Sequence, residues 1–135
     1  MNMTNFNDPS TVEKLQKALI IQEKCLLNHH PDLAVVYQSI ALVHEKLGKF
    51  NSALLYNGYA LRIRQKSLSA NDPIIGFIYN NIGSIHFSTG NHPQAFLCFL
   101  KALLIYRKTL EDNHRKINKV KKDIQHARKP LTSKP

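Results

Sequence analysis

The chain has 135 residues, of which 43 % are hydrophobic and 21 % charged, and its formal net charge is +10. This balance suits one soluble globular domain and excludes a disordered or collagen-like chain. No apolar run reaches the roughly 18 residues that a membrane-spanning helix needs, and the polar N-terminus lacks a secretory signal. The two cysteines, Cys25 and Cys98, have no CxxC spacing, which argues against a disulfide framework or a cysteine-built zinc site and favours a cytoplasmic location.

The chain begins with a polar segment, residues 1–8, that we expect to be disordered. A first helix is predicted over 9–28, started either by Asp8 and Pro9 or by a capping box of Ser10 and Glu13. No partner helix precedes it, so residues 9–30 are predicted to be the second helix of a partial repeat. This raises two hypotheses: the chain is the C-terminal part of a larger multi-repeat or multidomain protein, and the open edge of this helix supports self-association.

The middle of the chain is a duplicated unit. Shifting the sequence by 42 positions places residues 31–72 over residues 73–114 without a gap. The identical pairs include Pro31/Pro73, Tyr37/Tyr79, Ile40/Ile82, His44/His86, Gly48/Gly90, Ala53/Ala95 and Ala60/Ala102. Two structural repeats of equal length are therefore expected, one over each range.

Each unit is predicted to fold as two helices. In the first helix apolar residues recur at three- and four-residue spacing, and Gly48 or Gly90 ends it in a left-handed cap. The second helix begins near Phe50 or His92 and places alanines on its inward face. No segment alternates with period two, so no sheet is expected. The predicted helices span 9–28, 32–47, 50–69, 74–88, 92–111 and 115–129.

The last predicted helix, 115–129, differs from the others and is followed by a tail, 130–135. It has one narrow apolar stripe among basic and polar residues, which is typical of a helix that caps a stacked array. The basic cap residues are Lys116, Lys119, Lys122 and Arg128. A solvated end of the array explains them; contact with nucleic acid or an acidic partner is the alternative. No aromatic residues interleave with these cations, so base stacking is unsupported.

The repeat resembles the tetratricopeptide repeat, in its longer kinesin-light-chain-like form. The residues of the second full copy that carry the resemblance are Tyr79, Ile82, Gly83, His86, Gly90, Ala95, Phe99 and Ala102. The phrases ALRIRQKSL and ALLIYRKTL match the family's second helix. The resemblance implies an all-α fold, an α-solenoid of stacked antiparallel helix pairs. The chain would supply about two and a half repeats and a C-terminal capping helix.

The resemblance also implies that the first helix of each pair lines a concave groove for an extended peptide or a partner helix. The groove residues predicted on this basis are Val35, Gln38, Ser39, Leu42 and Lys46 in the first copy and Phe77, Asn80, Asn81, Ser84 and Phe87 in the second. Asn80 and Asn81 match the family's asparagine pair, whose amides grip peptide backbone. For the four apolar residues of this set, packing beneath a neighbouring helix is the alternative.

The remaining candidates favour structural roles. His44 and His86 are expected to be inward aromatic rings rather than metal ligands, and both cysteines are expected to be packing residues. The stripe of Leu97, Leu100 and Leu104 is expected beneath the end helix, with a partner surface as the alternative.

The sequence contains no nucleophile–base set and no phosphate-binding loop. It therefore predicts a non-catalytic protein-interaction module without cofactor or metal.

Overall fold

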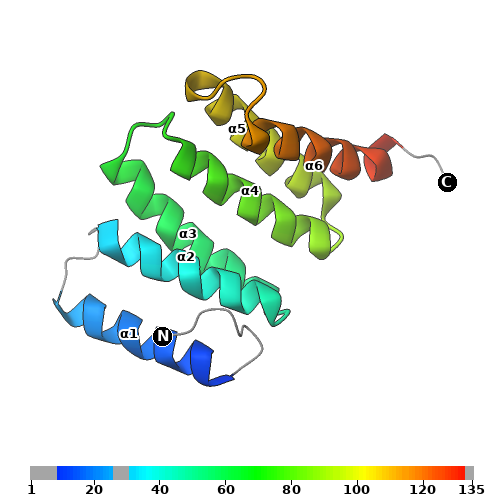
Figure 1. Ribbon diagram of the computed structural model, residues 1–135. Helices are drawn as coiled ribbons and strands as arrows, with labels where there is room; N and C mark the ends of the chain where they lie inside the picture. Colours follow the sequence, from blue (N-terminus) through cyan, green and yellow to red (C-terminus); the bar gives the residue numbers. More distant parts are fainter. Residues whose placement is uncertain (1–8, 26–30, 133–135) are drawn as a thin grey trace. The chain divides into compact units, whose positions relative to one another are not determined.

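The computed structural model describes residues 9–25 and 31–132, with side chains for residues 9–18 and 32–132. These residues form six helices and no strand, which confirms the all-α prediction (Figure 1). The helices are α1 (Pro9–Cys25), α2 (Pro31–Lys46), α3 (Phe50–Ser67), α4 (Pro73–Ser88), α5 (His92–Thr109) and α6 (Arg115–Thr132). The proposed disorder of residues 1–8 lies outside the described residues. Helix α6 continues three residues past its predicted end at residue 129 and contains Pro130.

The chain divides into two compact units, unit 1 (Met1–Ser67) and unit 2 (Leu68–Pro135). In unit 1, α2 packs against both α1 and α3; in unit 2, α5 packs against both α4 and α6. Consecutive helices within a unit run in opposite directions, as short connections require (Figure 1). The duplicated sequence therefore produces two helical hairpins, α2–α3 and α4–α5, whose helices match in length, 16 and 18 residues.

The turn inside each hairpin is built on a glycine. Gly48 and Gly90 have φ values of 76° and 81°, a left-handed conformation that side-chain-bearing residues rarely adopt. The next residue closes the helix end: the amide of Lys49 donates to the carbonyl of His44, and that of Asn91 donates to the carbonyl of His86, each at 2.8 Å. These bonds satisfy carbonyls that the helix end would otherwise leave open, so the predicted glycine caps are confirmed.

The core of unit 2 lies between α5 and α6. It is made of one face of each helix, and its buried members are Ala95, Phe99, Ala102, Leu103, Tyr106, Ile117, Val120 and Ala127. The strict spacing of apolar residues in α6 thus buries one side of that helix and leaves its lysines and arginines outside. In unit 1 the buried apolar residues include Leu33, Ile40 and Val43 of α2, all with no exposed surface.

Candidate functional site

The outer face of α4 combines apolar and hydrogen-bonding side chains. Phe77 and Phe87 keep 41 % and 37 % of their surface exposed, and the half-buried Asn81 and Ser84 lie on the same face at helical spacing. Lys116 of α6 holds its ammonium 5.5 Å from the centre of the Phe77 ring. Rings of this exposure offer area to a ligand, while amides and hydroxyls offer it hydrogen bonds.

Asn80 stands apart from these neighbours because α6 covers it. Only 6 % of its surface is exposed. Its Nδ2 donates to Oδ2 of Asp123 at 3.2 Å, and its Oδ1 accepts from Nζ of Lys119 at 3.3 Å. Lys119 also donates to the same Asp123 oxygen at 2.8 Å, which closes a three-membered network. In this structure the Asn80 amide therefore links α4 to α6, and Asn81 is the more accessible member of the pair.

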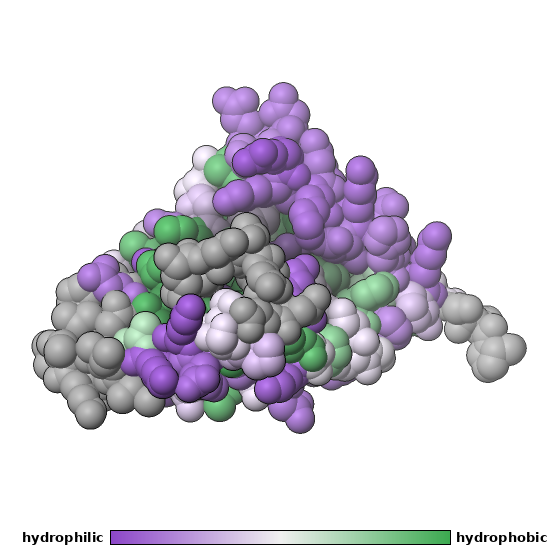
Figure 2. All heavy atoms as spheres, turned by 60° about the horizontal axis from the view of Figure 1, so that its bottom comes forward, coloured by the Kyte–Doolittle hydropathy of each residue, from purple (hydrophilic) through white to green (hydrophobic). Residues whose placement is uncertain are grey.

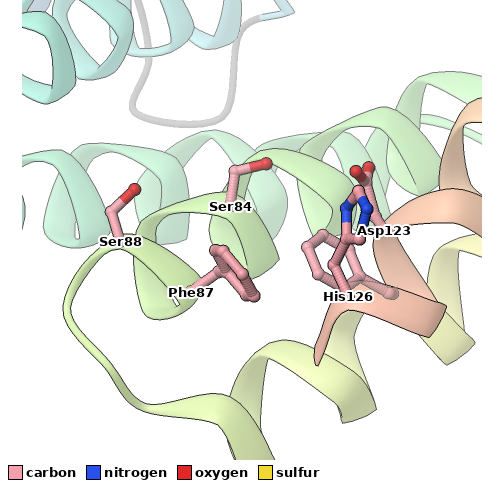
Figure 3. A pocket seen from close by; sticks show the side chains of 6 residues that line it. Ser84, Phe87, Ser88, Asp123 and His126 are labelled. Atoms are coloured by element: carbon pink, nitrogen blue, oxygen red, sulfur yellow. The ribbon is translucent and has the colours of Figure 1, made fainter. Parts of the chain in front are cut away.

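A hollow of about 150 Å³ lies where α4 and α6 diverge. Its lining combines two aromatic rings, two hydroxyls, a carboxylate and an imidazole, from Ser84, Phe87, Ser88, Phe99, Asp123 and His126. Figure 3 shows Phe87 on α4 and Asp123 and His126 on α6 facing the space between the two helices. The predicted groove residues Ser84 and Phe87 are thus brought together, and sequence reasoning missed the contributions of Asp123 and His126.

The predicted groove residues of unit 1 lie on α2. Val35 and Leu42 are 53 % and 41 % exposed, and Lys46 is also exposed. Two polar members are engaged within the unit: the Ser39 hydroxyl donates to the carbonyl of Val35 at 2.9 Å, and the Gln38 carbonyl oxygen accepts from Nη2 of Arg64 at 3.5 Å. This face therefore offers apolar surface and one cation, with less free hydrogen-bonding capacity than α4.

The four basic cap residues of α6 separate into two kinds. Lys116 lies over Phe77 and Lys119 is bound to Asp123, so both act within unit 2. Lys122 and Arg128 are exposed. Figure 2 shows hydrophilic side chains along the surface that leads to the C-terminal end, where α6 lies. Contact of this surface with an acidic partner or nucleic acid stays a prediction.

His44 and His86 occupy equivalent positions in their hairpins but different surroundings. His44 is only 4 % exposed, contacts Tyr56 edge-on at 5.4 Å between ring centres, and has no hydrogen-bond partner on either ring nitrogen. Burial, aided by the positive charge of Lys49, lowers the pKa of His44 below 6.5. His86 is half-exposed, and its Nδ1 lies 3.5 Å from Nδ2 of Asn91. The described residues contain no group of three or more His, Cys, Asp or Glu positioned to hold a metal.

Helix α5 carries three further candidate residues, Leu97, Cys98 and Leu104. Leu97 and Leu104 are 48 % and 61 % exposed, so the expectation that the end helix covers them is wrong: α6 packs on the opposite side of α5. Cys98 is a half-buried free thiol whose pKa is raised by burial, although the charge of Lys101 opposes this. The side chain of Cys25 lies outside the described residues.

Comparison with known proteins supports the repeat. The profile of the Tetratricopeptide repeat family matches residues 78–116, which cover most of α4, all of α5 and the start of α6. A solved structure of a putative kinesin light chain with nearly identical TPR-like repeats, from Podosopora anserina, superimposes with a TM-score of 0.82 over 90 % of this chain, at 20 % sequence identity. The chain has the tetratricopeptide repeat fold.

A second structure, BtubC (BKLC) from P. vanneervenii, gives a TM-score of 0.83 over 89 % of the chain at 21 % identity. The predicted resemblance to kinesin-light-chain-like tetratricopeptide repeats is thereby confirmed. This chain spans 58 % and 48 % of the lengths of the two solved chains. No curated protein matches it in sequence. Tetratricopeptide arrays expose extended surfaces suited to protein interaction. In the described part of the chain, no helix is both long enough and apolar enough to cross a bilayer.

Proposed function

We propose that the chain is a non-catalytic protein-interaction module that binds a polypeptide segment on the α4–α6 face of unit 2. The observation that carries the proposal is the exposure of Phe77 and Phe87 on the same helix face as Asn81 and Ser84. Large apolar side chains on a solvent-exposed surface indicate an interaction site when hydrogen-bonding groups surround them.

Each part of this face has a role suited to an extended peptide. The rings of Phe77 and Phe87 supply apolar area for side chains of the ligand. The Asn81 amide carries both donors and an acceptor, so it can pair with the N–H and C=O of one peptide unit. The hollow beside Phe87 accepts a side chain projecting from that peptide. The hydrogen bonds of Asn80 to Lys119 and Asp123 hold α6 beside α4, so that α6 forms one side of the site.

The α2 face of unit 1, taken by itself, is proposed as a second interaction surface. Val35 and Leu42 offer exposed apolar surface, and Lys46 offers a positive charge. Because Gln38 and Ser39 are already hydrogen-bonded, we expect this surface of α2 to offer mainly apolar contacts to a ligand. We propose a cytoplasmic setting, which is consistent with the free thiol of Cys98.

The proposal is tested with peptides of known sequence. A random peptide display library is selected on the 135-residue chain, and the enriched peptide is synthesised with a fluorescent label for anisotropy titration. We expect Phe87→Ala and Asn81→Ala each to weaken binding by about tenfold or more, the loss typical of central interface residues. Leu55→Ala, at an exposed leucine of α3, is the matched control and should leave the affinity unchanged.

Two results contradict the proposal. One is a selection that enriches no peptide above background. The other is an enriched peptide whose affinity falls with Leu55→Ala but not with Phe87→Ala or Asn81→Ala, which would move the binding site away from α4.

A further inference from the structure

Helix α5 carries apolar residues on the face directed away from its own core. Its inward face is formed by Ala95, Phe99, Ala102 and Tyr106, which are at most 2 % exposed. Leu97 and Leu104 are two turns apart on the opposite side of the helix. Their exposed fractions, 48 % and 61 %, are high for leucine. Because α4 and α6 already occupy the inward side of α5, the unit itself does not account for these two leucines.

The outward residues follow the spacing of a helix-pairing seam. Leu97, Leu100 and Leu104 stand at i, i+3 and i+7, the a–d–a spacing with which one helix packs along another. Leu100 is half-buried and lies at the edge of this face. Lys101 and Lys108 are exposed beside the leucines. We name these five residues, Leu97, Leu100, Lys101, Leu104 and Lys108, the α5 stripe.

The charged residues within helix α5 all have one sign, although the exposed Glu111 and Asp112 follow shortly after its end. Helix α5 contains Lys101, Arg107 and Lys108 but no aspartate or glutamate. Positions that flank a seam select the partner by charge, because opposite charges attract across the interface and like charges repel. A partner helix with leucines on its seam and acidic residues beside them therefore complements this surface.

Unit 1 contains the same helix position without the stripe. Leu55 of α3 matches Leu97 in the repeat and is also exposed, at 52 %. Arg62 stands where α5 has Leu104, so α3 has a single outward leucine rather than a seam. The repeat fold alone thus does not demand apolar residues at these positions, and the stripe is a feature of unit 2.

We propose that the α5 stripe is a docking surface for an acidic amphipathic helix of a partner protein. This site lies on the second helix of the repeat, outside the α4–α6 face, and does not depend on the peptide-binding function proposed above. The leucines supply the buried area, while Lys101 and Lys108 set the partner's charge and its orientation.

The test uses a synthetic fluorescent peptide as the partner. Its heptads carry Leu at a and d and Glu at e and g, and repulsion between its glutamates keeps it from pairing with itself. A second peptide carries Lys in place of Glu. We expect the 135-residue chain to bind the acidic peptide, with an affinity that falls as salt is added, and to ignore the basic one.

Variants then assign the binding to the stripe. We expect Leu97→Ser/Leu104→Ser to weaken binding of the acidic peptide by about tenfold or more. Lys101→Glu/Lys108→Glu should abolish it and create binding of the basic peptide. Leu55→Ser, the matched position of unit 1, and Lys121→Glu, on the exposed side of α6, should change neither. All six substituted positions are exposed, although the ammonium of Lys101 also lies 5.4 Å from the centre of the Tyr79 ring. Circular dichroism verifies that each variant is folded.

Three outcomes of the binding measurements overturn the proposal, and a fourth comes from the Phe87→Ala variant. The acidic peptide fails to bind; or it binds with unchanged affinity to both double variants; or the chain binds phosphatidylserine-containing vesicles through the same leucines while the peptide does not bind. The last result would assign the stripe to an anionic membrane surface instead. Loss of binding through Phe87→Ala alone would likewise place the acidic helix on the α4–α6 face and remove the stripe's role.

Discussion

The two hairpins α2–α3 and α4–α5 have equal helix lengths and the same glycine turn, yet different side chains hold their helices together. In α4–α5, two glycines face two large rings: a Cβ added to Gly76 would lie 2.8 Å from Tyr106, and one added to Gly83 would lie 2.7 Å from Phe99. The repeat-equivalent residues of α2–α3 are Ala34, Ala41, Asn57 and Arg64. At these matched positions α4–α5 packs rings against bare backbone, whereas α2–α3 packs smaller or polar groups against alanine. The rings that join α2 to α3 lie at other positions, where Tyr37 contacts Tyr56 and Tyr59.

This difference has an electrostatic consequence. In α2–α3, both ring nitrogens of His44 and the Nε of Arg64 are buried without a hydrogen-bond partner, whereas among the described residues of α4–α5 this holds for Nδ1 of His92 alone. Buried polar groups that lack a partner cost about 1–3 kcal/mol each. The rings of Phe99 and Tyr106 bury apolar area with little such cost; in Tyr106 burial raises the hydroxyl pKa to about 12. We therefore expect unit 2 to be the more stable half of the chain.

The largest test of this comparison removes the ring at the centre of unit 2. Phe99→Ala should lower the free energy of unfolding of unit 2 by about 3–5 kcal/mol, because it deletes a fully buried ring and leaves a cavity. Hydrogen–deuterium exchange of the α4 and α5 amides, followed by mass spectrometry, measures the loss unit by unit.

The matched change in unit 1 is Asn57→Ala, at a residue that is 2 % exposed. This substitution removes less volume than Phe99→Ala and also removes a polar group. We therefore expect the free energy of unfolding of unit 1, measured from amide exchange in α2 and α3, to fall by about 1 kcal/mol. Equal losses at the two positions would contradict the idea that the hairpins are packed by different means.

A second test addresses the glycine rather than the ring. Gly83→Ala should destabilise unit 2 by about 1–3 kcal/mol, because the new methyl group meets Phe99 and also lies 3.2 Å from the Cβ of Cys98. In a Phe99→Ala background the same substitution should cost much less, since its main obstacle is gone. A double-mutant cycle of urea unfolding measures this coupling.

The reverse substitution in unit 1, Ala41→Gly, is the control. Asn57 takes the place of the Phe99 ring in that hairpin, so we expect only the helix-propensity loss of about 1 kcal/mol. The coupling prediction is wrong if Gly83→Ala costs the same with and without the Phe99 ring.

Much of this architecture is predictable from the sequence because it repeats. The 42-residue shift predicts the helix order, the glycine turns and the inward position of His44. Local chemistry explains the success: a left-handed glycine ends a helix, and apolar spacing selects the buried face. Such signals act within a few residues, so a single sequence contains them.

The candidate site was less predictable because it depends on contacts between distant segments. The bonds of Asn80 to Lys119 and Asp123 join residues about 40 positions apart. A signal was present: the same shift that relates the hairpins places Asp123 over Asn81, which predicts α6 beside α4 as the next first helix. The exposure of Leu97 and Leu104 was missed for a related reason, since apolar spacing alone does not tell on which side of α5 the capping helix packs.

An effect as small as those of the two control substitutions is predicted for the buried histidine of unit 1. His44→Phe should raise the free energy of unfolding by about 1 kcal/mol at pH 8, because phenylalanine fills the same site with no ring nitrogen left unbonded. Urea unfolding of wild type and variant measures the change. His86→Phe, at the matched and half-exposed position of unit 2, controls for the exchange of an imidazole ring for a phenyl ring.

The pH dependence of the stability of wild type and His44→Phe separates the electrostatic effect of His44 from its packing. Burial and Lys49 hold the pKa of His44 below 6.5, so the unfolded chain binds a proton that the folded chain resists. Wild-type stability should therefore fall as the pH drops below about 6.5, and this loss should be smaller in His44→Phe. Stability profiles of equal slope between pH 5 and 8 would show that the ring nitrogens carry no penalty, and the predicted weakness of unit 1 would then rest on volume alone.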